Sequence, residues 1–133
     1  MSLFQHSVDI SFGDCDPAGL VFYPNYFRWM DATFHAFLHI RAGGHASLCK
    51  SLGARGIGLM ESRLMFRSPA NEGERLLYEI DNISWEPRSL TLTYSASAEG
   101  RHVLEGMERR GVFVMDGARM KAADLCSLKD SLQ

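Results

Sequence analysis

The sequence predicts an α+β protein in which an antiparallel sheet packs against one long helix. Three observations support this prediction. Residues 24–40 have the apolar spacing of a helix. Four strand-like segments then follow one another without an intervening helix. Within one of them, residues 89–98, apolar and polar side chains alternate. Runs of strands after a single helix are typical of α+β folds rather than of repeated βαβ units.

The helix is preceded by one expected strand. Residues 4–12, FQHSVDISF, contain β-forming residues in imperfect alternation and predict a first strand that ends at the turn over residues 13–19. Pro24 favours the first turn of a helix. The apolar positions that follow it are Tyr26, Met30, Phe34 and Phe37 or Leu38. Their spacing of three to four residues predicts a helix, which the pair Gly43 and Gly44 ends.

The remaining elements are strands with short helical additions. Strands are expected at residues 59–67, 74–85, 89–98 and 102–115, a short helical turn at 45–53, and a frayed helix at 122–131. A sheet of five strands has one face that a single apolar helix can cover.

The composition is that of one globular domain, which we expect to span residues 1–133. Hydrophobic residues make up 46% of the chain and charged residues 23%, which suits a packed core. The net charge of -2 gives no sign of the basic face that nucleic-acid binding requires. The three cysteines, an odd number at wide spacing, predict a reducing cytoplasm. No apolar run reaches the roughly 20 residues of a membrane span, so no membrane association is expected.

Residues 13–19, GDCDPAG, place Asp14 and Asp16 on a turn just before the helix. The stretch lacks the spacing of a calcium loop, and no histidines have HExxH spacing, so no metal is expected. His35 and His39 lie four residues apart and are interpreted as surface histidines. No GxSxG elbow or phosphate-binding glycine loop occurs, and Cys15 has no histidine partner in the sequence. The acids therefore either shape the turn or act on a substrate.

The position of the turn favours the second interpretation. An acid here is followed by Gly19 and then by the N-terminus of a helix near Tyr23. Helix N-terminal N–H groups stabilise a developing oxyanion, and a nearby carboxylate can act as a nucleophile or a general base. Acyl transfer needs both groups.

The stretch GDCDPAGLVFYPNYFRWMD resembles the signature of the 4-hydroxybenzoyl-CoA thioesterase family, whose pattern is roughly D-x-D-x-x-G-h-V-[FWY]-[YH]-x-x-Y followed by a helix. The match covers residues 12–31, and the length and order of elements agree along the whole chain. The resemblance implies a hotdog fold, in which a five-stranded antiparallel sheet wraps one long central helix. It also implies that the protein is an acyl-CoA thioesterase, hydrolysing an aromatic thioester such as hydroxybenzoyl-CoA or a short aliphatic one.

The resemblance assigns roles to individual residues. It implies that Asp16 is the catalytic carboxylate, as nucleophile or general base, and that the Tyr23 backbone N–H polarises the thioester carbonyl. Asp14 would order the loop. Asp31, one or two turns into the helix, would face the acyl pocket together with Tyr26 and Trp29.

The phosphates of CoA require basic residues at the entrance. The resemblance implies that Arg88, Ser89, Arg109 and Arg110 serve this purpose. The stretch WEPRS at residues 85–89 is less basic than in the family. No cofactor is expected.

Two alternatives remain open at the level of sequence. A non-catalytic acyl-thioester binding or assembly protein could keep the same fold. A hotdog dehydratase is a second alternative, although its D-x-N-x-x-H type of motif is missing. The resemblance further implies a homodimer that joins two sheets edge to edge, or a homotetramer built from two such dimers.

Overall fold

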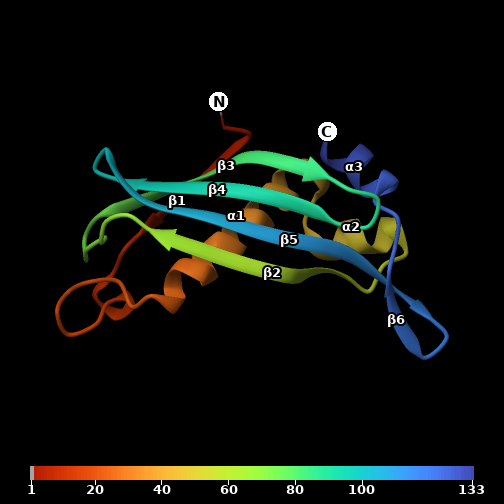
Figure 1. The fold of residues 1–133 in the computed structure, drawn as a ribbon, viewed down its shortest axis with the longest axis horizontal. Coiled ribbons are helices and arrows are strands. Elements are labelled where there is room, and N and C mark those ends of the chain that lie inside the picture. Colours follow the sequence, from red (N-terminus) through yellow and green to blue (C-terminus); the bar gives the residue numbers. More distant parts are fainter. Residues whose placement is uncertain (1) are drawn as a thin grey trace.

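The computed structural model describes residues 2–133 and has the predicted α+β architecture, with a curved antiparallel sheet on one side of a long helix (Figure 1). The elements in chain order are β1 (Phe4–Asp9), the 3-10 turn η1 (Phe12–Asp14), α1 (Pro24–Ala42), α2 (His45–Leu52), β2 (Gly56–Phe66), β3 (Arg75–Trp85), β4 (Leu90–Ala98), β5 (Arg101–Asp116), β6 (Arg119–Ala122) and α3 (Cys126–Leu132). The strand order is β1-β3-β4-β5-β2, with β6 paired to the far end of β5.

Helix α1 forms the centre of the core. Pro24 occupies its first turn, as predicted, and Gly43 ends it in the left-handed conformation with φ of 79°. The Gly43 N–H donates to the carbonyl of His39, which satisfies the end of the helix. The buried face of α1 consists of Tyr26, Trp29, Met30, Thr33, Phe34, Phe37 and Leu38.

The concave face of the sheet covers this helix. Along β4 every second residue is buried, so the alternation predicted for residues 89–98 is confirmed. Sheet and helix approach closely at Gly106 of β5, where an added Cβ would lie 2.6 Å from the Met30 Sδ. A side chain at this position would force the side chains of Met30 and Leu64 to shift.

The sheet differs from the five-stranded prediction by one additional short strand. Strand β5 continues to Asp116 and turns back through Gly117, with φ of 64°, so that β6 pairs with it. The sequence DGAR at residues 116–119 contains an Asp-Gly turn signal typical of hairpins, which the sequence prediction did not use. The first strand also stops at Asp9, and residues 12–14 form the 3-10 turn.

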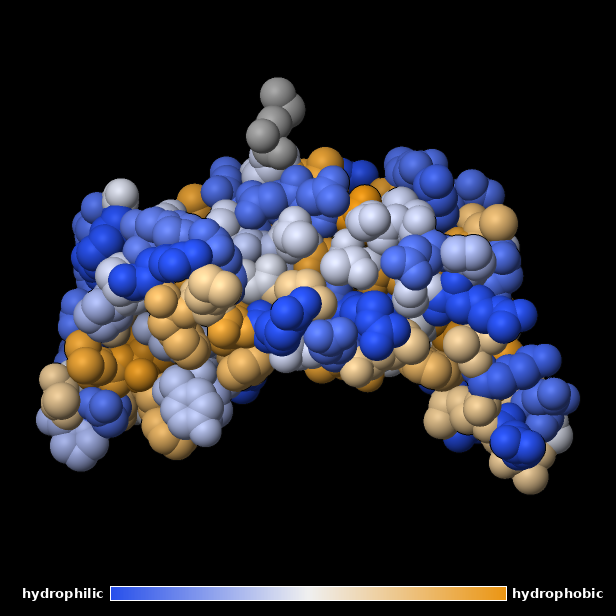
Figure 2. Space-filling view, in the orientation of Figure 1, coloured by the Kyte–Doolittle hydropathy of each residue, from blue (hydrophilic) through white to orange (hydrophobic). Residues whose placement is uncertain are grey.

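Strand β2 is an edge strand with apolar side chains exposed to solvent. Leu59, Met60, Met65 and Phe66 are each 41% to 54% exposed. Figure 2 shows that the molecule is concave along this edge, between one projection made by the loop before α1 and another made by the β5–β6 hairpin. Within residues 2–133, no helix has both the length and the apolar character of a membrane span.

Candidate active site

Asp14 ties the loop before α1 to the start of the helix. Its Oδ2 accepts hydrogen bonds from the N–H and the hydroxyl of Ser11, both at 3.0 Å. Its Oδ1 lies 3.5 Å from the Arg28 guanidinium. Its main-chain carbonyl accepts from the Phe22 N–H at 2.9 Å and from the Asn25 side chain at 2.8 Å. The residue is thus occupied by contacts within the loop.

The Asp16 carboxylate is held by the backbone of its own turn. Its Oδ1 accepts the N–H groups of Ala18 at 2.8 Å and Leu20 at 3.3 Å, a local turn in which Gly19 has φ of 82°. Its Oδ2 receives no hydrogen bond from any residue in the range 2–133. Backbone contacts therefore fix the orientation of this carboxylate and leave one oxygen available.

The N–H of Tyr23 lies at the N-terminus of α1. Tyr23 is the N-cap residue, with φ of -56° and ψ of -33°, and Pro24 follows it without an N–H of its own. Across the described part of the chain, the Tyr23 N–H has no acceptor, whereas the neighbouring Phe22 N–H is bonded. A free N–H at this position carries the positive end of the helix dipole and can bind an oxyanion.

Asp16 and Tyr23 border the same cavity. It has a volume of about 400 Å³, and its wall also includes Leu20, Val21, Tyr26, Phe66, Arg67, Ser68 and Pro69. The structure thus brings together the two groups that the sequence analysis assigned to catalysis. A carboxylate and a free helix N–H at one cavity are the two groups that acyl transfer needs.

Of two residues predicted to line the acyl pocket, Tyr26 borders this cavity and Trp29 lies behind its wall. Tyr26 lines this cavity, and its hydroxyl accepts the Ala70 N–H at 3.2 Å. Burial raises the pKa of Tyr26, so the phenol stays neutral. Trp29 does not line the cavity; it packs edge-on against Tyr26 with ring centroids 5.9 Å apart. Trp29 thus supports the wall rather than forming it.

Asp31, predicted to face the acyl pocket, does not line the cavity of Asp16 and Tyr23; it lies on the half-exposed face of α1, in contact with Arg110. The Arg110 guanidinium reaches Asp31 Oδ1 at 2.7 Å. The same guanidinium is paired with Glu108 at 2.9 Å, and only 3% of the Arg110 side chain is exposed. Arg110 was predicted to contact CoA, but the structure places it on the inner face of the sheet among carboxylates. Its position follows from strand alternation, because Leu104, Glu108 and Val112 share that face.

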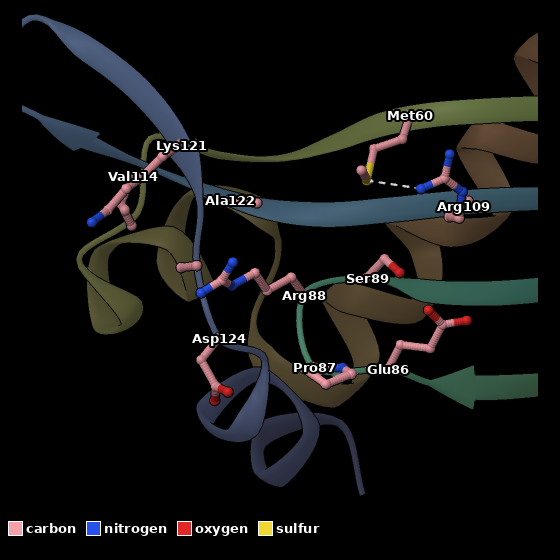
Figure 3. Close-up of a pocket in the computed structure, with 11 residues that line it drawn as sticks. Met60, Glu86, Pro87, Arg88, Ser89, Arg109, Val114, Lys121, Ala122 and Asp124 are labelled. Carbon is pink, nitrogen blue, oxygen red and sulfur yellow. Dashed lines mark hydrogen bonds between the residues drawn. The ribbon is translucent and has the colours of Figure 1, made fainter.

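The other predicted CoA-binding residues lie together in a second cavity, of about 740 Å³ (Figure 3). Arg88 and Ser89 come from the segment before β4, and Arg109 comes from the face of β5 opposite Arg110. Lys121 of β6 adds a third cation that the sequence analysis did not identify, because the hairpin was not predicted. Figure 3 shows Arg109 beside Met60 and Arg88 extending toward the chain between β6 and α3.

The two cavities border β2 at its middle and at its C-terminal end. Met60 lines the second cavity and Phe66 lines the first. Six residues of extended strand separate these positions by roughly 20 Å. A ligand that used both cavities of one chain would have to follow the exposed edge of the sheet between these two positions.

Known proteins resemble the chain along its full length. A 4-hydroxybenzoyl-CoA thioesterase from Pseudomonas sp. (strain CBS-3) is 29% identical over 123 residues, which are 87% of this chain and 86% of the relative. A structure of 4-hydroxybenzoyl-CoA thioesterase from that strain superposes with a TM-score of 0.86 at 28% identity and covers all of both chains. A gentisyl-coenzyme A thioesterase structure gives 0.78 at 26% identity, covering 94% of this chain and 98% of that one. No family model matches the chain.

The fold and the comparisons define this protein as a hotdog-fold thioester hydrolase. The carboxylate and the helix N–H in one cavity agree with that class. Its particular resemblance is to 4-hydroxybenzoyl-CoA thioesterase, and the family likeness predicted from residues 12–31 is confirmed.

Proposed function

We propose that the protein hydrolyses an aromatic acyl-CoA to the free acid and CoA, with Asp16 as the catalytic carboxylate. The observation that carries this proposal is the cavity shared by Asp16 and Tyr23. Backbone hydrogen bonds orient Asp16, and the Tyr23 N–H is free to bind a carbonyl oxygen. Stabilisation of a developing oxyanion by such fixed donors is a large contribution to acyl-transfer catalysis.

Two routes use this geometry. In the first, an Asp16 oxygen attacks the thioester carbonyl carbon while the carbonyl oxygen binds the Tyr23 N–H. The C–S bond breaks, CoA leaves as a thiolate that takes a proton, and water hydrolyses the resulting anhydride. In the second, Asp16 removes a proton from water as the water attacks the same carbon. Both routes yield one carboxylic acid and one free thiol.

Asp31 supports an aromatic acyl group with a hydroxyl at its far end. It follows Tyr23 by eight residues on the same helix, a distance of about 12 Å along the helix axis. Asp31 does not itself line the cavity of Asp16 and Tyr23, but an aromatic acyl group with a hydrogen bond at each end has a length of this order. The relatives named above act on hydroxybenzoyl-CoA and gentisyl-CoA, which also carry ring hydroxyls.

The second cavity suits the phosphates of CoA. Arg88 and Arg109 supply positive charge there and Ser89 supplies a hydroxyl, whereas Lys121 at its edge is paired with Asp116 at 3.5 Å. Two carboxylates, Glu86 and Asp124, also line the cavity and offset part of this charge. Charge-assisted hydrogen bonds to phosphate are about twice as strong as neutral ones.

A homodimer joined along β2, with a tetramer formed from two such dimers, accounts for the separation of the cavities. Antiparallel pairing of two β2 strands across a twofold axis would bring the cavity that Asp16 lines in one protomer toward the second cavity, lined by Arg88 and Arg109, of its partner. The exposed apolar side chains of β2 support such pairing, because an open apolar edge is otherwise prone to aggregation. The three free cysteines, Cys15, Cys49 and Cys126, support a location in the reducing cytoplasm.

Release of free thiol from acyl-CoA tests the function. We expect the wild-type protein to cleave 4-hydroxybenzoyl-CoA and benzoyl-CoA, and Asp16→Asn to be at least about 100-fold slower. Asparagine keeps an oxygen acceptor for the loop N–H groups, so the melting temperature should stay close to that of the wild type. If both proteins are inert toward aromatic and aliphatic acyl-CoAs yet bind them, the non-catalytic alternative holds instead.

A further inference from the structure

The loop between β2 and β3, residues 67–74, is attached to the turn that carries Asp16. Three backbone contacts join them: the Val21 N–H donates to the Ala70 carbonyl at 3.1 Å, the Glu72 N–H donates to the Gly19 carbonyl at 3.2 Å, and Leu20 and Asn71 form an antiparallel bridge. Leu20 is also one of the two residues whose N–H groups hold the Asp16 carboxylate. The position of the Asp16 turn therefore depends on the position of this loop.

A side-chain ion pair fixes the loop from the side of the sheet. Nη2 of Arg101, the first residue of β5, donates to the two Glu74 carboxylate oxygens at 2.8 and 3.1 Å. The same nitrogen donates to the Pro69 carbonyl at 2.9 Å. Glu74 Oε1 also accepts the Asn71 N–H at 2.8 Å and the Asn71 side-chain amide at 3.0 Å. Arg101 and Glu74 together hold the loop near both of its ends.

The same loop forms part of the wall of the cavity that Asp16 and Tyr23 border. Residues 67–69 line this cavity directly. Ala70 is fully buried, and its N–H donates to the hydroxyl of Tyr26, which lines the same cavity. The loop therefore connects the ion pair to the cavity.

The pair of Arg101 and Glu74 is more shielded from solvent than a surface ion pair. Their side chains are 37% and 16% exposed, whereas Arg75 and Asp9, which pair at 2.8 Å on neighbouring strands, are 69% and 77% exposed. The hydrogen bond from Arg101 lowers the pKa of the Glu74 carboxyl, so this group stays ionised at neutral pH. A partly buried, charge-assisted contact of this kind constrains a loop more than an exposed pair does.

We propose that Arg101 is a positioning residue that acts through Glu74 and the loop to hold Asp16 in place opposite the Tyr23 N–H. Neither Arg101 nor Glu74 lines the cavity, so neither is assigned contact with the substrate. Tyr23 begins a rigid helix, whereas Asp16 lies on a turn, so a shift of the turn changes the separation of the two catalytic groups. A misplacement of about 1 Å can cost about 100-fold in rate. This inference rests on the proposed function.

The test separates the rate of thiol release from substrate binding. Arg101→Met keeps an aliphatic side chain and removes the donor, and its kcat with 4-hydroxybenzoyl-CoA should fall at least about tenfold. Binding is measured without turnover by combining Arg101→Met with Asp16→Asn. The Kd of this double variant for 4-hydroxybenzoyl-CoA should stay close to that of Asp16→Asn alone, because Arg101 does not line the cavity.

Two further variants of the ion pair show whether the contact itself matters. All three contacts of Arg101 with Glu74 and Pro69 come from Nη2, and a lysine ammonium offers three donors at one nitrogen. Arg101→Lys should therefore recover most of the kcat that Arg101→Met loses. Arg101→Met with Glu74→Gln leaves no unpaired carboxylate and should be as slow as Arg101→Met, so it carries the test if the single variant does not fold.

Arg75→Met is the matched control. It breaks the exposed pair with Asp9, one position along the chain from Glu74, and should leave kcat unchanged. Rates are compared well below the melting temperature of each variant, so that partial unfolding does not contribute to the loss.

Three results would contradict the reasoning in different ways. A wild-type kcat in Arg101→Met, or in its combination with Glu74→Gln, would overturn the inference and leave the proposed function intact. A loss of binding in the Asp16→Asn background as large as the loss of rate would assign Arg101 to substrate binding instead. Failure of the proposed function is distinct, since the wild-type protein would then release no thiol at all.

Discussion

The two aspartates of the GDCDPAG turn should respond to substitution in opposite ways. Asp14→Ala removes the acceptor of two hydrogen bonds from Ser11 at 3.0 Å and an ion pair with Arg28 at 3.5 Å. The Arg28 side chain is 62% exposed, so that pair contributes little. The two hydrogen bonds are worth about 1 to 2 kcal/mol together in a partly solvated loop. The melting temperature should fall by roughly 3 to 8 °C for a chain of this size.

Asp16→Asn supplies the matched comparison. It should cost little stability and nearly all activity, whereas Asp14→Ala should cost stability and keep a measurable rate at temperatures where it is folded. Thermal unfolding and thiol release, measured on the same preparations, give the two quantities. An Asp14→Ala protein that melts with the wild type but releases no thiol would refute the assignment of Asp14 to the loop.

Two further predictions concern stability. Burial, together with the neighbouring His35 and Arg110, lowers the pKa of His45 from 6.5, and its Nε2 accepts the Ile57 N–H at 3.1 Å. As the pH falls, His45 takes up a proton in the unfolded chain before it does so in the folded chain, so the free energy of unfolding should decline below about pH 6.5. Urea unfolding at pH 7 and pH 5 should show a smaller decline for His45→Gln than for the wild type. Gly106→Ala would place a Cβ 2.6 Å from Met30 Sδ and should cost about 1 to 3 kcal/mol in the same assay. Gly13→Ala, with no atom within 4 Å of the added Cβ, is its control and should change little.

The parts of the fold that the sequence predicted depend on local signals. The spacing of apolar residues, Pro24 and the glycine pair after residue 42 define α1, and none of these signals depends on distant contacts. The Asp16 turn and the Tyr23 N–H are also close in sequence, so their proximity in the structure follows from one short loop. The separate roles expected of Asp14 and Asp16, by contrast, came from the resemblance of residues 12–31 to the family signature.

The environment of Arg110 could not be predicted in this way. Its partner Asp31 is 79 residues away, and the contact depends on the register of β5 against its neighbours and on the seating of α1. Alternation along residues 102–115 carried a partial signal, since Arg110 has the same parity as Leu104 and Val112. That parity places Arg110 on the inner face of the sheet and Arg109 on the outer face. It does not reveal the carboxylates that make burial of a guanidinium tolerable.

Helix α1 unites these observations, because the same rigid element supplies both ends of the proposed acyl site. Met30, Phe34 and Leu38 are fully buried, which fixes the helix against the sheet. The separation between the Tyr23 N–H and Asp31 is therefore set by helix geometry, at about 1.5 Å per residue, rather than by a mobile loop. An acyl group too short to reach Asp31 would still meet Asp16 and Tyr23 but would lose the far hydrogen bond. Selection should thus act on the length of the acyl group together with its hydroxyl.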